Sequence, residues 1–88
     1  MRFDYHPRYT KKMAKLDKKI RLKIYETLAR FNENPFDITL RNHGLHGKMG
    51  NCRSIAVTGD IRIIFELQDD NYENIHVLDI GTHSQLYQ

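Results

Sequence analysis

Histidines stand at two places in this sequence where proton transfer is a natural use for them. His83 and Tyr87 lie four residues apart beyond an apolar run near the end of the chain, and His43 and His46 lie in a segment that carries three glycines. Histidine exchanges protons near neutral pH, and a tyrosine ring can stack on an unpaired base. The tail therefore suits acid–base chemistry on a phosphate or a base, and a simple C-terminal cap is the alternative.

Cleavage of RNA without a metal requires side chains in three catalytic roles. A base removes the proton from the ribose 2′-hydroxyl, cations offset the charge that builds on the phosphate, and an acid protonates the departing 5′-oxygen. A general acid or base contributes roughly 10²–10⁴-fold, and arginine binds phosphate with a planar fork of donors. The candidates for proton transfer and stacking are His83, His43, His46, Asp60 and Tyr87, and those for phosphate binding are Lys48, Arg53 and Arg62.

Other catalytic chemistries have less support in the sequence. A zinc site needs three or four converging ligands; His43, His46 and His83 could converge, but no HExxH motif or cysteine pair accompanies them. The sequence also has no phosphate-binding glycine loop and no serine triad signature. We therefore expect no metal and no small-molecule cofactor. Of the two remaining histidines, His6 is expected to be structural or solvated, and His76 is expected to be a satisfied histidine within the last strand.

Length and composition bound the class of protein. Eighty-eight residues, 40% of them hydrophobic, are enough for one small core, so we expect a single domain over residues 1–88. The lone cysteine, Cys52, excludes an intramolecular disulfide and is typical of a reducing compartment. No apolar run approaches the roughly 18 residues of a membrane span, and residues 1–7 lack the apolar stretch of a signal peptide. We expect a cytoplasmic protein that does not enter a membrane.

The two parts of the chain carry opposite charge. Residues 1–53 hold 13 of the 14 lysines and arginines and five acidic residues, a net charge of +8, whereas residues 54–88 hold one arginine and six acidic residues, a net charge of −5. The basic part can bind a polyanion such as RNA or an acidic protein, and a solvated helix face is the plainer alternative. Its lysines are Lys11, Lys12, Lys15, Lys18, Lys19, Lys23 and Lys48.

Two helices are predicted in the basic part. After a short strand over residues 2–6, apolar residues at 9, 13 and 16 recur with helical spacing. Asp17 can cap a second helix, and Pro35 biases the residue before it away from helix, so that helix ends there. Its apolar stripe consists of Ile20, Ile24, Leu28 and Phe31. Because the link between the two helices is short, we expect an antiparallel helical hairpin.

Three strands are predicted in the remaining part, after a loop over residues 36–51. They cover residues 53–57, 61–67 and 75–80, with a hairpin turn at Thr58-Gly59-Asp60 and with Gly81 ending the last strand. The predicted order is β-α-α-β-β-β with a short C-terminal segment. The fold class is α+β, with the helical hairpin packed on one face of an antiparallel sheet.

Two motifs carry a resemblance to a known family. They are Asn42-His43-Gly44-Leu45-His46-Gly47-Lys48 followed by Arg53, and Gly81-Thr82-His83-Ser84-Gln85-Leu86-Tyr87. With this spacing and strand order, essentially the whole chain resembles the YafQ-like mRNA interferases of the RelE/ParE toxin superfamily, which belong to type II toxin–antitoxin modules. The resemblance implies a RelE-like fold with a curved antiparallel sheet and cleavage of mRNA in the ribosomal A site. It also implies a cognate antitoxin that wraps the basic surface and blocks the site.

The resemblance assigns roles position by position. His43 matches the loop histidine of the family, and Asp60 matches the carboxylate at the hairpin turn. His83 matches the terminal histidine, the principal acid–base group, and Tyr87 stands where the family has a terminal aromatic residue.

Two positions depart from the pattern of the family. Ala56 stands where relatives often have another catalytic histidine, and Ile61 stands where they often have tryptophan. His46 could take the place of this missing histidine from the loop. Alternatively, the cations Arg53, Arg62 and Lys48 could contribute more to catalysis, as Arg and Lys do in toxins of the RelE type proper. The alternatives are a ParE-like gyrase inhibitor that is not a nuclease and a catalytically degenerate binding module.

Overall fold

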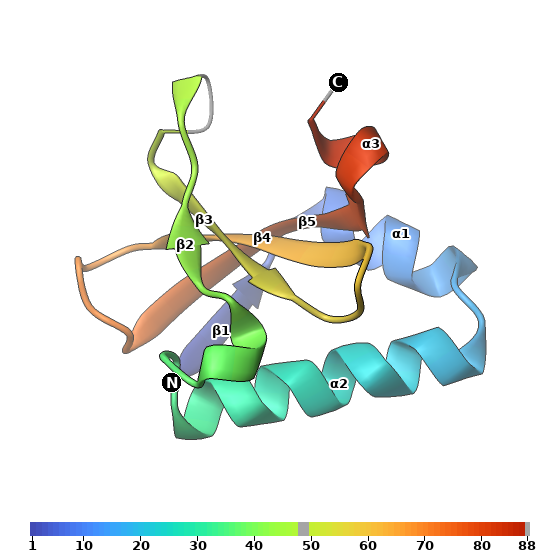
Figure 1. The fold of residues 1–88 in the computed structure, drawn as a ribbon, viewed down its shortest axis with the longest axis horizontal. Helices are drawn as coiled ribbons and strands as arrows, with labels where there is room; N and C mark the ends of the chain where they lie inside the picture. The colour runs from blue at the N-terminus through green and yellow to red at the C-terminus, as the bar shows by residue number, and fades with distance from the viewer. Residues whose placement is uncertain (48–49, 88) are drawn as a thin grey trace.

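The computed structural model describes residues 1–47 and 50–87. Its elements are β1 (Arg2–Tyr5), α1 (Pro7–Lys15), α2 (Lys18–Glu33), the 3₁₀ helix η1 (Ile38–Leu40), β2 (His43–Gly44), β3 (Cys52–Ala56), β4 (Ile61–Leu67), β5 (Asn74–Thr82) and α3 (His83–Leu86). Figure 1 confirms the α+β class and the predicted order of the main helices and strands. No helix within the described residues is long and apolar enough to span a membrane. Lys48, predicted to bind phosphate, lies outside the described residues.

The five strands form one sheet in the order β1-β5-β4-β3-β2. Strands β2 to β5 pair antiparallel, as predicted, but β1 pairs parallel with β5, so the prediction of a wholly antiparallel sheet is wrong. Backbone hydrogen bonds from Arg2 N to Glu73 O (2.7 Å) and from His6 N to Val77 O (2.8 Å) extend this parallel pairing at both ends. Apolar periodicity tells which face of a strand is buried and leaves its neighbour unspecified.

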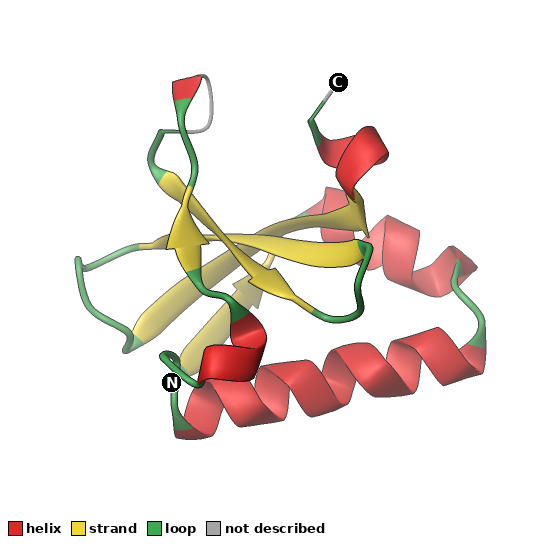
Figure 2. Ribbon diagram, in the orientation of Figure 1, coloured by secondary structure: helices red, strands yellow, loops and turns green. Residues whose placement is uncertain are grey.

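Helices α1 and α2 pack on one face of the sheet (Figure 2). Side chains at helical spacing on α2 turn inward, and the ring of Phe31 meets Phe65 of β4 edge-on, with ring centroids 4.9 Å apart. The core unites both helices with η1, β3, β4 and β5, and its buried members are Tyr9, Met13, Ile24, Leu28, Phe31, Leu40, Ile55, Ile63, Phe65, Ile75, Val77 and Ile80. The predicted stripe of α2 is therefore confirmed as the core-facing side of that helix.

Side-chain caps fix where the two helices begin. The Nδ1 atom of His6 accepts a hydrogen bond from Arg8 N, and an Asp17 carboxylate oxygen accepts one from Ile20 N, each at 3.0 Å. Each cap satisfies a backbone N–H that has no partner within its helix. Asp17 therefore caps α2 as predicted, and His6 has the structural role that was expected of it.

Strand β5 is longer than predicted, and its length places the tail. Gly81 pairs with Arg62 and Thr82 pairs with Ile61 inside the ladder, so Gly81 does not end the strand. Helix α3 begins directly after it, at His83. The tail is therefore fixed to the end of a paired strand.

The predicted loop over residues 36–51 also contains regular structure. Helix η1 lies within it, and β2 pairs with β3 through His43–Ser54 and Gly44–Arg53. A strand of two residues is too short to show a period in the sequence. This pairing attaches the histidine-containing motif to the edge of the sheet.

Candidate functional site

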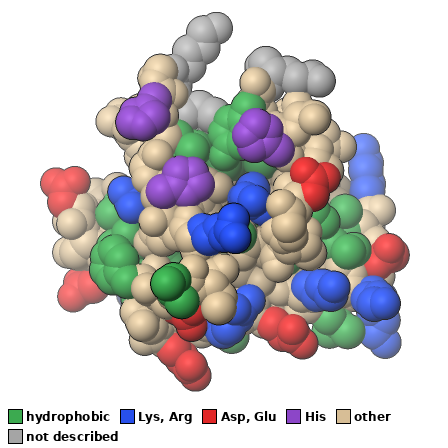
Figure 3. Space-filling view, in the orientation of Figure 1, with side chains coloured by type: hydrophobic (Ala, Val, Ile, Leu, Met, Phe, Trp, Pro, Cys, Tyr) green, Lys and Arg blue, Asp and Glu red, His purple; other side chains and the backbone are tan. Residues whose placement is uncertain are grey.

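Two of the predicted site residues, His43 and Arg62, belong to the face of the sheet opposite α1 and α2, which we call the open face. Side chains alternate along a strand, so Ser54 and Ala56 of β3 point away from the core that contains Ile55. Paired residues share a face, which places His43 of β2 and Arg62 of β4 on the open face as well. Figure 3 shows histidine side chains gathered in the upper part of the view, with lysine or arginine side chains beside them.

A hydrogen bond to the preceding segment of the chain selects one tautomer of His43. Its Nδ1 atom lies 2.7 Å from the carbonyl oxygen of Arg41. A carbonyl can only accept a hydrogen bond, so Nδ1 carries the proton and donates it. In the neutral ring, Nε2 is then left with a free lone pair. The exposed His43 side chain is therefore prepared to accept a proton at Nε2.

His83 and Tyr87 lie together at α3, where His83 is the first residue of the helix and Tyr87 is its C-cap. Their ring centroids are 4.6 Å apart, and Tyr87 N donates a hydrogen bond to His83 O at 3.1 Å. The two side chains meet because positions i and i+4 share a face of a helix. The structure thus brings the acid–base candidate and the phenol into direct contact, with His83 exposed to solvent.

Asp60 lies at the same end of the sheet as His83, although 23 positions separate the two residues in the sequence. Ile61, the residue after Asp60, pairs with Thr82, the residue before His83. The Oγ1 atom of Thr58 accepts hydrogen bonds from Asp60 N (3.2 Å) and Ile61 N (3.0 Å) and so secures the turn. The turn that carries Asp60 therefore lies beside the start of α3.

His43 and His83 approach the open face from opposite sides. β2 and β5 are three strand spacings apart in the sheet, which is roughly 14 Å. In Figure 1 the segment that contains β2 and helix α3 both rise from the same side of the sheet. The backbone segments that carry His43 and His83 are therefore separated by β3 and β4.

Arg41 is a site candidate that the sequence did not reveal. It follows η1 in the left-handed conformation (φ 50°), which is uncommon for a residue with a side chain. Continuing the β2–β3 register places it opposite Ala56. A cavity of about 220 Å³ at this edge of the sheet is lined by Arg41, Ala56, Thr58 and Arg62, among others. The position where relatives often have histidine is thus flanked by two arginines.

Arg62 also holds the turn between β3 and β4. Its Nη1 atom donates to Thr58 O (2.7 Å) and Ile61 O (3.1 Å), and its Nη2 atom donates to Gly59 O (3.1 Å). Hydrogen bonds from a charged donor contribute about 1.5–3 kcal/mol each to stability at most. Arg62 therefore combines a structural role with its position on the open face.

Arg53 lies on the other face of the sheet from His43. It pairs with the core residue Phe65, and its Nε atom donates to Asn42 Oδ1 at 2.8 Å. The Nδ2 atom of Asn42 donates in turn to Tyr72 Oη and Pro35 O, each at 3.0 Å. Arg53 thereby anchors the segment before β2, and its phosphate-binding role stays a prediction.

His46 lies farther along the β2 segment. The hydrogen bond from Leu45 N to Cys52 O (2.9 Å) continues the pairing beyond β2. His46 is therefore five residues from the position opposite Ala56, roughly 16 Å along the strand. That distance argues against His46 as a substitute for a histidine at position 56, and its exposed side chain is available only near the tip of the segment.

The structure gives no support for catalysis by the Cys52 thiol. Burial raises the pKa of the Cys52 thiol, and the Glu66 carboxylate raises it further, so the thiol stays protonated and weakly nucleophilic near neutral pH. In the part of the chain that the structure describes, no three His, Cys, Asp or Glu side chains are grouped as metal ligands would be.

Comparison with known proteins gives a match over the whole chain. A family model described as "Bacterial toxin of type II toxin-antitoxin system, YafQ" matches residues 1–88. Comparison of the sequence with curated proteins finds no match.

Similar solved structures include the following three. A YoeB/ParE toxin from Agrobacterium tumefaciens has a TM-score of 0.77 at 16% identity, covering 94% of this chain and 99% of its own. The DinJ–YafQ toxin–antitoxin complex from E. coli has a TM-score of 0.68 at 25% identity, covering 98% and 96%. The toxin–antitoxin complex RelBE2 from Mycobacterium tuberculosis has a TM-score of 0.73 at 16% identity, covering 92% and 95%. The predicted RelE-like fold is confirmed.

Proposed function

Because the chain belongs to the YafQ family of bacterial toxins from type II toxin–antitoxin systems, we propose that it is a ribosome-dependent endoribonuclease. It cleaves mRNA by metal-independent acid–base catalysis and so inhibits translation. The arrangement of the open face carries this proposal: His43 and His83 approach it from opposite sides, and the arginines Arg41 and Arg62 line the cavity at Ala56.

The geometry supports a division of labour between the two histidines. Nε2 of His43, which carries the lone pair in the neutral tautomer that the Nδ1 contact with Arg41 O selects, removes the proton from the ribose 2′-hydroxyl. The resulting 2′-oxygen attacks the adjacent phosphorus, and the bond to the 5′-oxygen breaks. Protonated His83 gives its proton to that leaving oxygen, and Tyr87 packs against the His83 ring. The products are a 2′,3′-cyclic phosphate and a free 5′-hydroxyl.

Cations between the two histidines offset the charge that builds on the phosphate. Preorganised donors at such a position lower the barrier because they need no reorganisation during the reaction. The cavity lined by Arg41 and Arg62 offers two guanidinium groups there. With Ala56 in place of an imidazole, these arginines supply charge stabilisation where relatives often have a further proton-transfer group.

The partners follow from the same proposal. The substrate is mRNA held in the ribosomal A site, and the reaction needs no cofactor. The similar E. coli structure is a complex of a toxin with its antitoxin, and we propose that a cognate antitoxin binds this chain and covers the open face. The protein would act in the cytoplasm, where translating ribosomes are found.

Induction in a bacterial host tests the proposed function. We expect growth arrest, relief of the arrest by the co-expressed antitoxin, and discrete in-frame cuts when mRNA ends are mapped by primer extension. DNA damage without mRNA cuts would instead indicate a ParE-like gyrase inhibitor. Normal growth with a folded, soluble protein would indicate a binding module without catalysis.

Substitution of the two arginines separates phosphate binding from folding. Arg41→Ala is expected to lower the rate of mRNA cleavage by about 10²-fold with little change in stability, because its side chain is exposed. Arg62→Ala should lower the rate and also the free energy of unfolding, by about 1–3 kcal/mol, because three carbonyl contacts are lost. Cleavage assays and urea unfolding on the same preparations measure both. If the Arg41→Ala protein cleaved mRNA at the wild-type rate, Arg41 would not be part of the catalytic site.

Salt dependence tests whether the basic helices contact ribosomal RNA. Lys12 and Arg8 already pair with Asp79, at 2.7 and 3.8 Å, so we assign the RNA contacts to cations farther along the chain, such as Lys18 and Lys19. The logarithm of ribosome affinity should fall linearly with the logarithm of salt concentration. Replacing Lys18 and Lys19 with alanine should make that slope shallower by about 1 per lysine. A flat response in the wild type would mean that these lysines form only a solvated face.

A further inference from the structure

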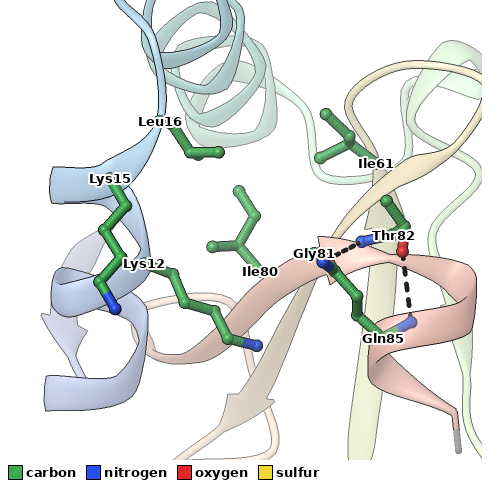
Figure 4. A pocket seen from close by; sticks show the side chains of 8 residues that line it. All are labelled: Lys12, Lys15, Leu16, Ile61, Ile80, Gly81, Thr82 and Gln85. Carbon is green, nitrogen blue, oxygen red and sulfur yellow. Dashed lines mark hydrogen bonds between the residues drawn. The ribbon is translucent and has the colours of Figure 1, made fainter.

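Helix α3 begins with a reciprocal pair of hydrogen bonds between Thr82 and Gln85. Thr82 N donates to Gln85 Oε1 at 2.9 Å, and Gln85 N donates to Thr82 Oγ1 at 3.2 Å (Figure 4). This capping box satisfies two backbone donors at the start of the helix. His83 is the first residue of α3, so its backbone lies inside the closed pair. We propose, building on the function proposed above, that Thr82 and Gln85 are positioning residues that hold His83 toward the open face.

Little else fixes the start of α3 on the side of α1. A cavity of about 320 Å³ lies between the two helices, with Lys12 and Lys15 along one side and Thr82 and Gln85 along the other (Figure 4). A four-residue helix is not stable by itself, because nucleation costs more than one turn of hydrogen bonds returns. Because a cavity separates Thr82 and Gln85 from Lys12 and Lys15 at this point, we infer that the capping box sets the direction in which α3 leaves the sheet.

Gly81, the residue before Thr82, also contributes to the geometry of the capping box. A Cβ atom at position 81 would lie 2.8 Å from Gln85 Oε1, closer than real Cβ atoms approach other atoms. Gly81 lies within β5 and has no positive φ, so its backbone does not require glycine. An alanine at this position would instead push the amide oxygen of Gln85 away from the strand, so the glycine leaves room for the closed capping box. The signature Gly81-Thr82-His83-Ser84-Gln85 therefore encodes a fixed starting geometry for the terminal histidine.

A cap that only secured the end of the chain would make a different prediction from one that positions His83. If the box acts through His83, its loss changes the rate of the chemical step and leaves ribosome binding alone, since a small misplacement of a reacting group is enough to slow the chemistry. If the box only secures the terminus, its loss changes stability and leaves the rate per folded molecule unchanged. Activity must therefore be separated into kcat and KM, and stability must be measured beside it.

Three single variants test the box in the full chain with programmed ribosomes. Gln85→Ala is expected to lower kcat about tenfold at unchanged KM for ribosomes. Gln85→Glu should retain most of the rate, because glutamate closes the same box. Ser84→Ala, the matched control on α3, should cleave like the wild type, since its side chain has no part in the box. A Gln85→Ala protein with wild-type kcat would overturn the proposal.

Two double variants show whether the effects run through the assigned contacts. In Gly81→Ala the new Cβ displaces Gln85 Oε1, so kcat should also fall about tenfold, and Gly81→Ala combined with Gln85→Ala should be no slower than Gln85→Ala alone. Gln85→Ala should add no further loss to a His83→Ala protein. Fully additive losses in either pair would contradict a positioning role.

A measurement without catalysis separates this proposal from the function on which it rests. Backbone amide order parameters of residues 83–86 should be near the value for a rigid chain, about 0.85, in the wild type and should fall below about 0.6 in Gln85→Ala. Unchanged order in Gln85→Ala would overturn the positioning role even if the protein cleaves mRNA. An inactive wild type whose order still falls in Gln85→Ala would overturn the endoribonuclease assignment and support the role of the box in fixing His83.

Discussion

Replacing His83 with alanine is expected to lower the rate of mRNA cleavage by roughly 10²–10⁴-fold, the range for loss of a general acid or base. The side chain is exposed at the start of α3, so the fold should be retained. Ribosome binding should also persist, because the basic helices lie elsewhere in the chain. Single-turnover cleavage on programmed ribosomes gives the rate, and circular dichroism confirms the fold.

A second histidine serves as the control for this variant. His76 is half-buried within β5, and its ring lies beside His6, with centroids 6.1 Å apart. His76→Gln should therefore cleave at close to the wild-type rate. If folded His83→Ala kept the wild-type rate, the assignment of His83 as an acid–base group would fail. If His76→Gln lost as much activity as His83→Ala, the two-histidine account of the site would fail.

Replacing Phe31 with alanine is expected to reduce the free energy of unfolding by about 3–5 kcal/mol. Phe31 is 1% exposed and packs against Phe65, with Tyr72 and Phe3 beside it. A typical domain has a stability of about 5–15 kcal/mol in total, so the variant should be marginally folded. Urea unfolding followed by circular dichroism measures the change.

Phe36→Ala supplies the matched control for Phe31→Ala. Phe36 is 65% exposed and touches Tyr72 with its ring edge, at a centroid distance of 5.1 Å. Its loss should cost about 1 kcal/mol or less. Equal losses for the two variants would mean that the helical face of the sheet does not form the core described above.

Elements that depend on local pattern could be predicted from the sequence. The stripe of α2 follows from helical spacing, the cap at Asp17 follows from side-chain chemistry, and the turn between β3 and β4 follows from Thr58-Gly59-Asp60. Each of these features is decided by neighbours within a few positions. The motifs that carry the family resemblance are local in the same sense, and the roles that they assign to His43 and His83 stay predictions.

Features that depend on pairing between distant segments could not be predicted. The parallel pairing of β1 with β5 brings together a strand near the start of the chain and a strand near its end. The hydrophobic periodicity of the sequence does not specify which strands pair. The face that Arg53 occupies follows from its pairing with Phe65. Arg41 lies at the candidate site because its backbone adopts the left-handed conformation at the end of η1. Arginine does not favour this conformation, so the sequence did not indicate it. Gly81 seemed to end a strand because its contact with Gln85 exists only once α3 has formed.

Cleavage of a defined mRNA by the purified protein, with and without programmed ribosomes, tests the central claim most directly. The account predicts discrete cuts within the A-site codon that appear only with ribosomes and that leave a 2′,3′-cyclic phosphate. Intact mRNA under saturating folded protein, or cuts that leave no 2′,3′-cyclic phosphate, would contradict it.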